Sequence, residues 1–93
     1  MLSVEATINL RTEEEGGLIR PGFSGMQPSM DINGELVACK ILEGFEGNPL
    51  GLGQEHDVQI DPAYGERFSN VRRAGFLFNL NVGGRIIGRG QIL

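Results

Sequence analysis

The last twenty residues, 74–93, constrain the fold more than any other stretch of the chain. Within them, apolar side chains recur at every second position from Phe76 to Val82. This period of two predicts a β-strand with one buried face. Gly83 and Gly84 follow at once, and two consecutive glycines can both take the positive φ that a two-residue hairpin turn requires. The sequence therefore predicts a C-terminal β-hairpin.

The strand that returns from this turn, residues 85–93, contains two internal glycines. We predict that one face holds Ile86, Gly88, Gly90 and Ile92, and that the other holds Arg85, Ile87, Arg89 and Gln91. Glycine inside a strand weakens packing and marks a bend, a bulge or the close approach of another backbone. A sharply coiled sheet needs such positions, so the two glycines favour a closed sheet.

The same alternation predicts four earlier strands, at residues 4–10, 26–33, 35–42 and 54–60. Residues 11–25, 44–53 and 62–73 are predicted to be connections, and no stretch has the 3.6-residue period of a helix. Six strands with short turns predict an all-β fold, a small six-stranded antiparallel barrel, because closure leaves the fewest open edges. The predicted core consists of Val4, Ile8, Met30, Ile32, Val58, Ile60, Phe76, Phe78, Leu80 and Ile92.

Length and charge narrow the class of protein. The 93 residues suffice for a single domain, 1–93, with one modest core. One cysteine excludes an intramolecular disulfide, and no signal peptide or membrane span is recognised, so we expect a cytoplasmic protein with no membrane association.

The net charge is −4, with all twelve acidic residues before position 67 and five of the eight basic residues from there on. This split either orients a charged partner or is neutralised between neighbouring strands.

No group of residues supports catalysis. His56 and Asp57 are adjacent in a strand, so their side chains are predicted on opposite faces and cannot form a dyad. Cys39 lies in an apolar run, where a small core residue is expected. One histidine and one cysteine in different strands give no metal site. We therefore expect no enzyme activity, no cofactor, no metal and no small-molecule substrate.

Three stretches resemble the C-terminal domain of elongation factor Tu. Residues 14–28 read Glu-Glu-Gly-Gly-Leu-Ile-Arg-Pro-Gly-Phe-Ser-Gly-Met-Gln-Pro, and the family has Glu-Gly-Gly-Arg-His-Thr-Pro-Phe-Phe-x-Gly-Tyr-Arg-Pro. Residues 83–90 read Gly-Gly-Arg-Ile-Ile-Gly-Arg-Gly, and the family has Gly-Gly-Arg-Thr-Val-Gly, a small residue and Gly. Residues 60–62, Ile-Asp-Pro, fall where the family has isoleucine, a basic residue and proline. The fragments occur in the family's order, and the similarity covers nearly the whole chain, with drift and a longer connection between Pro62 and Gly75.

This resemblance implies a six-stranded antiparallel barrel that binds and does not catalyse. In the whole factor, the domain helps to hold aminoacyl-tRNA, packs on the GTPase domain and meets the exchange factor. The chain has no GxxxxGK[ST] loop, so the GTPase domain is missing. The family's cationic positions also differ here, since Leu18-Ile19, Met26-Gln27 and Asp61 stand in their place. Cationic side chains that contact phosphates drive nucleic-acid binding by releasing counterions, and these replacements remove that contribution.

We therefore predict a stand-alone module that binds a protein, and one version of this hypothesis is that it mimics the factor. An apolar pair in a glycine-rich loop can anchor a protein contact, although the same residues can instead cap an open end of the barrel. The alternative is a translation-related module that binds tRNA or another RNA through the C-terminal arginines; the acidity of the chain and its single tyrosine argue against it. The candidate partner-binding residues are Leu18, Ile19, Arg20, Phe23, Arg72, Arg73, Arg85 and Arg89.

Overall fold

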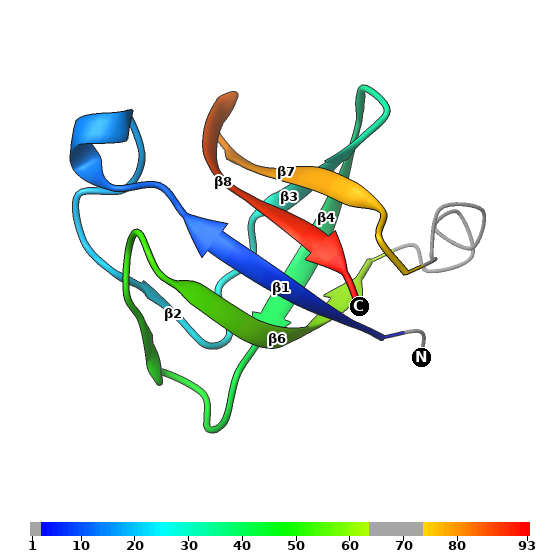
Figure 1. The fold of residues 1–93 in the computed structure, drawn as a ribbon, viewed down its shortest axis with the longest axis horizontal. Helices are drawn as coiled ribbons and strands as arrows, with labels where there is room; N and C mark the ends of the chain where they lie inside the picture. The colour runs from blue at the N-terminus through cyan, green and yellow to red at the C-terminus, as the bar shows by residue number, and fades with distance from the viewer. Residues whose placement is uncertain (1–2, 64–73) are drawn as a thin grey trace.

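Six strands form a closed antiparallel barrel (Figure 1). The structure is a computed structural model that describes residues 3–63 and 74–93. Around the barrel the strands follow the order β1-β6-β4-β3-β7-β8, and β8 closes the sheet by pairing with β1. Their bounds are β1 Val4–Leu10, β3 Ser29–Ile32, β4 Glu35–Leu42, β6 Glu55–Pro62, β7 Leu77–Val82 and β8 Arg85–Ile92. The predicted all-β, six-stranded antiparallel barrel is confirmed.

Three short elements lie in the connections. A single 3-10 turn, η1 (Glu13–Glu15), follows β1, and β2 (Gly22–Phe23) pairs with β5 (Pro49–Leu50) in a separate two-stranded sheet. The sequence predicted only loops at these places. Within the described residues, η1 is the sole helical segment, and no helix has the length and apolar character needed to cross a membrane.

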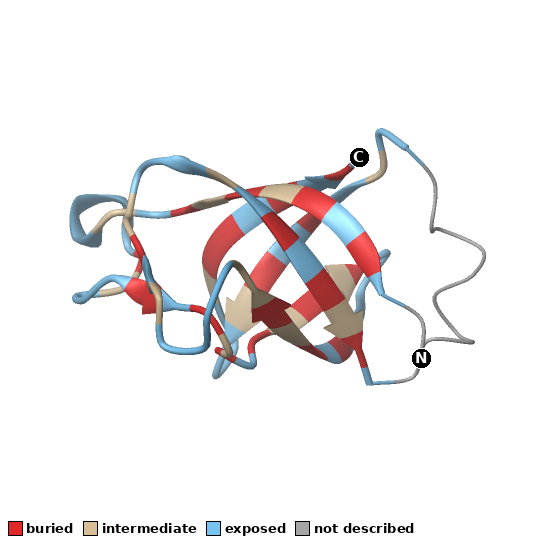
Figure 2. Ribbon diagram, turned by 90° about the horizontal axis from the view of Figure 1, so that it is seen from below, coloured by how far each residue is buried: buried red, intermediate tan, exposed pale blue. Residues whose placement is uncertain are grey.

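The core lies inside the barrel, and buried residues alternate with exposed ones along the strands (Figure 2). Nine of the ten predicted core residues are buried, while Phe76 is only partly buried because it precedes β7, where the barrel wall ends. The apolar core consists of Val4, Ala6, Ile8, Leu10, Met26, Met30, Ile32, Val37, Cys39, Ile41, Leu50, Val58, Ile60, Phe78, Leu80, Ile87 and Ile92.

A β-bulge in the C-terminal hairpin corrects the predicted faces of β8. Leu80 pairs with Gly88, but the next residue, Asn81, pairs with Ile86, so Ile87 has no partner of its own on β7. One extra residue shifts the alternation by one position. As a result Ile87 is fully buried and Ile86 is only half-buried, which is the reverse of the prediction.

The glycines of the hairpin serve the two purposes that the sequence suggested. Gly83 and Gly84 have φ values of 60° and 82° and form the tight turn. Gly88 faces β1 so closely that a Cβ there would lie 2.7 Å from the Asn9 carbonyl oxygen. Gly90 faces the ring of Phe78, its partner on β7, and leaves no space for a Cβ. Close approach of β8 to its neighbours therefore depends on both internal glycines.

Two strand boundaries differ from the prediction by two residues or more. The strand expected at 26–33 begins only at Ser29, because Pro28 has no N–H to donate to a neighbouring strand. The carbonyl oxygens of Met26 and Pro28 nevertheless accept hydrogen bonds from the Ile41 and Cys39 amides, so this segment still runs beside β4. At the other boundary, β6 continues to Pro62, which pairs with Cys39.

Candidate functional site

The predicted partner-binding loop contains both buried and exposed apolar residues. Leu18 is partly buried and packs against the core. Ile19 is 74% exposed and Phe23 is 51% exposed, and Arg20 between them is also exposed. The loop therefore has one apolar residue that packs against the core and two that lie at the surface.

The η1 turn fixes the start of this loop. The Glu15 carboxylate accepts hydrogen bonds from the Thr12 amide at 3.0 Å and from the Thr12 hydroxyl at 3.1 Å. These bonds, with smaller contributions from Arg11 and Arg89, lower the pKa of Glu15. Gly16 then takes a left-handed φ of 85° and ends the turn. The loop therefore leaves β1 along a defined path.

Backbone hydrogen bonds join the 22–25 segment to the 43–50 loop. Gly22 and Phe23 of β2 pair with Leu50 and Pro49 of β5. Beyond this pair, the Ser24 amide donates to the Asn48 carbonyl oxygen and the Gly47 amide donates to the Ser24 carbonyl oxygen, each at 2.8 Å. The two loops thus form one unit at an end of the barrel, and we call these segments the loop pair.

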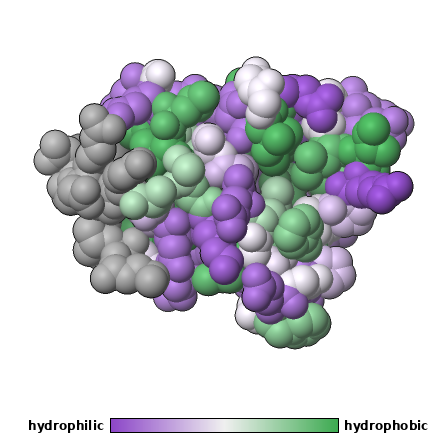
Figure 3. All heavy atoms as spheres, turned by 180° about the vertical axis from the view of Figure 1, so that it is seen from behind, coloured by the Kyte–Doolittle hydropathy of each residue, from purple (hydrophilic) through white to green (hydrophobic). Residues whose placement is uncertain are grey.

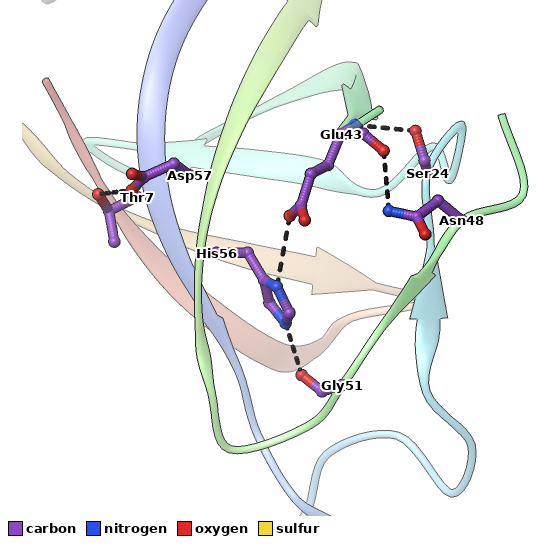
Figure 4. Close-up of polar contacts among 7 residues, drawn as sticks. All are labelled: Thr7, Ser24, Glu43, Asn48, Gly51, His56 and Asp57. Carbon is purple, nitrogen blue, oxygen red and sulfur yellow. Dashed lines mark hydrogen bonds and ion pairs between the residues drawn. The ribbon is translucent and has the colours of Figure 1, made fainter. Parts of the chain in front are cut away.

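Buried polar side chains reinforce the loop pair (Figure 4). Ser24 is fully buried, and its hydroxyl accepts a hydrogen bond from the Glu43 amide at 2.8 Å. The Asn48 side-chain amide donates to the Glu43 carbonyl oxygen at 3.1 Å. Both polar groups of the Glu43 backbone are therefore satisfied by side chains of the loop pair, which holds the two segments together.

His56 connects the same region to β6 (Figure 4). Its Nε2 lies 2.9 Å from the Gly51 carbonyl oxygen, which can only accept, so Nε2 donates this hydrogen bond. Its Nδ1 lies 3.3 Å from Oε2 of Glu43, a buried oxygen that makes no hydrogen bond within the described part of the chain. When Nδ1 also carries a proton, the imidazolium ring can pair with this carboxylate. His56 therefore contacts the chain on both sides of β5.

The loop pair presents a second phenylalanine that the sequence analysis missed. Phe45 is 72% exposed and lies in the turn where the Asn48 amide donates to the Phe45 carbonyl oxygen. Its sequence signal is the one used for Phe23, an aromatic residue between glycines in a polar loop. We call Ile19, Phe23 and Phe45 the apolar loop surface. In the view of Figure 3, apolar side chains gather in separate groups between hydrophilic ones.

The candidate arginines are separated from this surface along the chain. Arg85 and Arg89 are both exposed on β8, with Arg85 next to the hairpin turn and Arg89 near the middle of the strand. Arg72 and Arg73 lie outside the described residues. The structure therefore places two of the four arginines on one strand of the barrel wall.

The residues considered for catalysis lie in unrelated surroundings. Asp57 accepts a hydrogen bond from the Thr7 hydroxyl on the outer face of the barrel, whereas His56 points toward Gly51 (Figure 4). Burial raises the pKa of the Cys39 thiol to about 12, so this side chain is a protonated core residue at neutral pH. In residues 3–63 and 74–93, no three histidine, cysteine or acidic side chains are grouped so that they could hold a metal ion.

Comparison with protein-family models and with curated protein sequences gives no match to this chain. The geometry of the described residues is therefore the basis for the functional proposals below.

Proposed function

We propose that this chain is a non-catalytic binding module that contacts a protein partner through the apolar loop surface. One observation carries the proposal: Phe23 and Phe45 are exposed on two segments that are joined by backbone and buried side-chain hydrogen bonds. Large apolar side chains that stay exposed on an ordered loop favour an interface, since solvent exposure gives them no stabilising role in the isolated domain.

The energetics of association agree with this proposal. Burying a phenylalanine side chain contributes roughly 1.5–3 kcal/mol relative to leaving it exposed. Binding also costs free energy when loops must become ordered, and hydrogen bonds that already order a loop lower that cost. The bonds around Ser24 and Glu43 have this effect on the loop pair. Two phenylalanines therefore suffice as anchors for a modest protein interface.

The resemblance to the C-terminal barrel of elongation factor Tu supports a binding role in the same way. It suggests a barrel whose role is to bind other molecules. If this chain mimics that barrel, its partner would be a protein that normally binds the factor. RNA binding through Arg72, Arg73, Arg85 and Arg89 is the alternative. It is disfavoured by the net charge of −4, because an acidic chain repels the phosphates of a polyanion.

A photo-crosslinking experiment tests the proposed surface. The crosslinking amino acid benzoylphenylalanine would replace Phe45 in one variant and Leu36 in another, since both side chains are exposed, at 72% and 54%. We expect the position-45 variant to form a discrete adduct with one protein in native lysate, identifiable by mass spectrometry. Leu36 lies on β4, outside the loop pair, so its variant should not form that adduct. Equal adducts from both positions, or none from position 45, would contradict the proposal.

A further inference from the structure

A row of polar residues crosses the outer wall of the barrel on five neighbouring strands. Asp31 on β3 pairs with Asn79 on β7, and Asn79 pairs with Arg89 on β8. Arg89 in turn pairs with Asn9 on β1, and Asn9 pairs with Glu55 on β6. We call these five residues the Arg89 row. Their strand neighbours Met30, Phe78, Leu80, Ile8 and Leu10 are buried, so the row faces outward.

The central side chains of this row have no partner within the barrel. Asn79, Arg89 and Asn9 make no side-chain hydrogen bond and no ion pair in the part of the chain that the structure describes. Elsewhere on the same wall, Thr7 and Asp57 are also paired across strands, and they do form a hydrogen bond at 2.9 Å. The middle of the Arg89 row is thus open to an external ligand.

Two hollows of the surface meet at Arg89. The larger, of about 460 Å³, lies between Asp31, Asn79 and Arg89. The smaller, of about 150 Å³, lies between Arg89, Asn9 and Glu55. Leu77 lines both hollows and is 71% exposed. Arg89 therefore stands where the two hollows meet, and Leu77 is the exposed apolar side chain that they share.

The charges along the groove define what it can bind. A single cation, Arg89, lies between Asp31 on one side and Glu55 on the other, and neutral amides separate them. Neighbouring strands are about 4.8 Å apart, so each acidic residue is roughly 10 Å along the wall from Arg89. A complementary ligand carries one negative group between two positive ones. A nucleic acid, with a phosphate at every nucleotide, would meet both acidic residues and be repelled.

A third hollow, on the η1 side of Arg89, does not provide this cation with a fixed partner. It is lined by Asn9, Arg11, Glu15 and Arg89. Glu15 is its acidic residue, and the charge of Arg89 contributes to lowering the pKa of Glu15, but the two side chains form no ion pair. Arg89 is therefore available for a carboxylate brought by a ligand.

From these observations we infer that the Arg89 row is a second binding site, which takes an extended peptide segment with one acidic side chain flanked by basic side chains. The acidic side chain binds the guanidinium group of Arg89, which is suited to a two-pronged contact with a carboxylate. The flanking basic groups lie toward Asp31 and Glu55, while the amides of Asn79 and Asn9 bind peptide groups of the ligand. Leu77 contacts an apolar side chain of the same segment. This site is independent of the apolar loop surface.

An NMR titration of the whole chain tests the inference. The probe is the acetylated and amidated pentapeptide Lys-Val-Glu-Val-Lys, and its control is Lys-Val-Gln-Val-Lys. With the first peptide we expect saturable shift changes at Asn9, Leu77 and Asn79. The glutamine peptide should bind about tenfold more weakly or not at all, because it cannot form the charge-assisted contact. No saturable change up to about 5 mM of the first peptide, or equal binding of both peptides, would overturn the inference.

Matched protein variants locate the contact. Arg89→Gln should weaken binding of the glutamate peptide about tenfold, whereas Arg85→Gln should leave it within about twofold, since Arg85 is exposed on β8 but lines neither hollow. The NMR spectrum of each variant shows whether that variant is folded. If a variant does not fold, the comparison of the two peptides on the parent protein still tests the inference. Unchanged affinity in folded Arg89→Gln would overturn the inference. A ten-nucleotide oligouridine that causes larger shift changes at the same residues than the glutamate peptide would also overturn the inference, and would assign the groove to RNA.

Discussion

Close contacts at single residues determine how β8 closes the barrel. Gly88 sits against the backbone of β1, opposite Leu10, and its missing side chain leaves room for the Asn9 carbonyl oxygen. Backbone cannot move aside as the end of a long side chain can. The closure of the sheet therefore depends on a residue without a side chain, because only then can the backbones of β1 and β8 approach this closely.

Replacement of this glycine should destabilise the fold. In Gly88→Ala the new Cβ would lie 2.7 Å from the Asn9 carbonyl oxygen, so the β1–β8 pair must separate. We expect a loss of about 1–3 kcal/mol in the free energy of unfolding, the range found for overpacking, measured by urea denaturation. Gly51→Ala is the matched control, because its Cβ would meet only the side chain of the exposed Gln54. Equal stability of the two variants would contradict this account of closure.

The buried thiol of Cys39 gives a chemical measure of folding. Its pKa is raised to about 12 by burial, and the thiolate is the reactive form. At pH 8 we expect iodoacetamide to modify the folded protein far more slowly than the urea-unfolded protein, as followed by mass spectrometry. Between the ordinary thiol pKa of 9.0 and about 12, only the unfolded state loses this proton, so Cys39 lowers the stability of the fold as pH rises through that interval. Equally fast labelling of both states would show that the thiol is accessible.

At the scale of elements, regular strands followed from the sequence more readily than the loops did. Alternation of apolar residues located the six barrel strands, because a buried face imposes a period of two on any strand. It could not locate the bulge at Ile87, since both Ile86 and Ile87 are apolar and the pattern allows either to face inward. The β2–β5 pair was also missed, because two-residue strands are too short to show a period.

The candidate site was predictable only in part for a similar reason. Phe23 and Ile19 were identified by their apolar character in a glycine-rich loop. Their relation to Phe45 depends on hydrogen bonds between segments about twenty residues apart, which no local pattern encodes. The arrangement of the loop pair could thus be obtained only from the structure.

Loss of one buried hydroxyl should loosen the loop pair. Ser24→Ala leaves the partly buried Glu43 amide without its acceptor, and we expect a cost of about 1 kcal/mol, the low end of the range for an unsatisfied buried amide. We expect faster hydrogen exchange at the amides of Ser24, Glu43 and Gly47, with the barrel strands little affected. Thr7→Ala is the control, because it removes an exposed hydrogen bond to Asp57. Unchanged exchange in Ser24→Ala would mean that the loops are held by other contacts.

At the scale of the whole molecule, the charge of the chain bears on the class of its partner. The net charge is −4, and all twelve acidic residues lie before position 67. The groove at Arg89 contains one cation between two acidic residues. Both features favour protein over nucleic acid as the ligand.

We therefore expect no tight complex with tRNA. In about 150 mM salt, gel-shift or fluorescence titration with tRNA and with duplex RNA should detect no binding at micromolar protein, because few counterions would be released. A complex of micromolar affinity that weakens steeply with added salt would contradict this expectation. It would favour the alternative function based on the arginines of the C-terminal half.

The most direct test of the proposed function combines affinity and stability in one double variant. Phe23→Ser/Phe45→Ser removes both aromatic rings of the apolar loop surface, and Leu36→Ser/Val82→Ser is the matched control at two exposed side chains of the barrel strands. For the protein identified by crosslinking, we predict that the phenylalanine variant binds at least about tenfold more weakly while the control binds like the parent. The melting temperature of the phenylalanine variant should stay within about 3 °C of the parent, because exposed side chains stabilise the fold little. Unchanged affinity, or a large fall in melting temperature, would contradict the account by showing that these rings are structural.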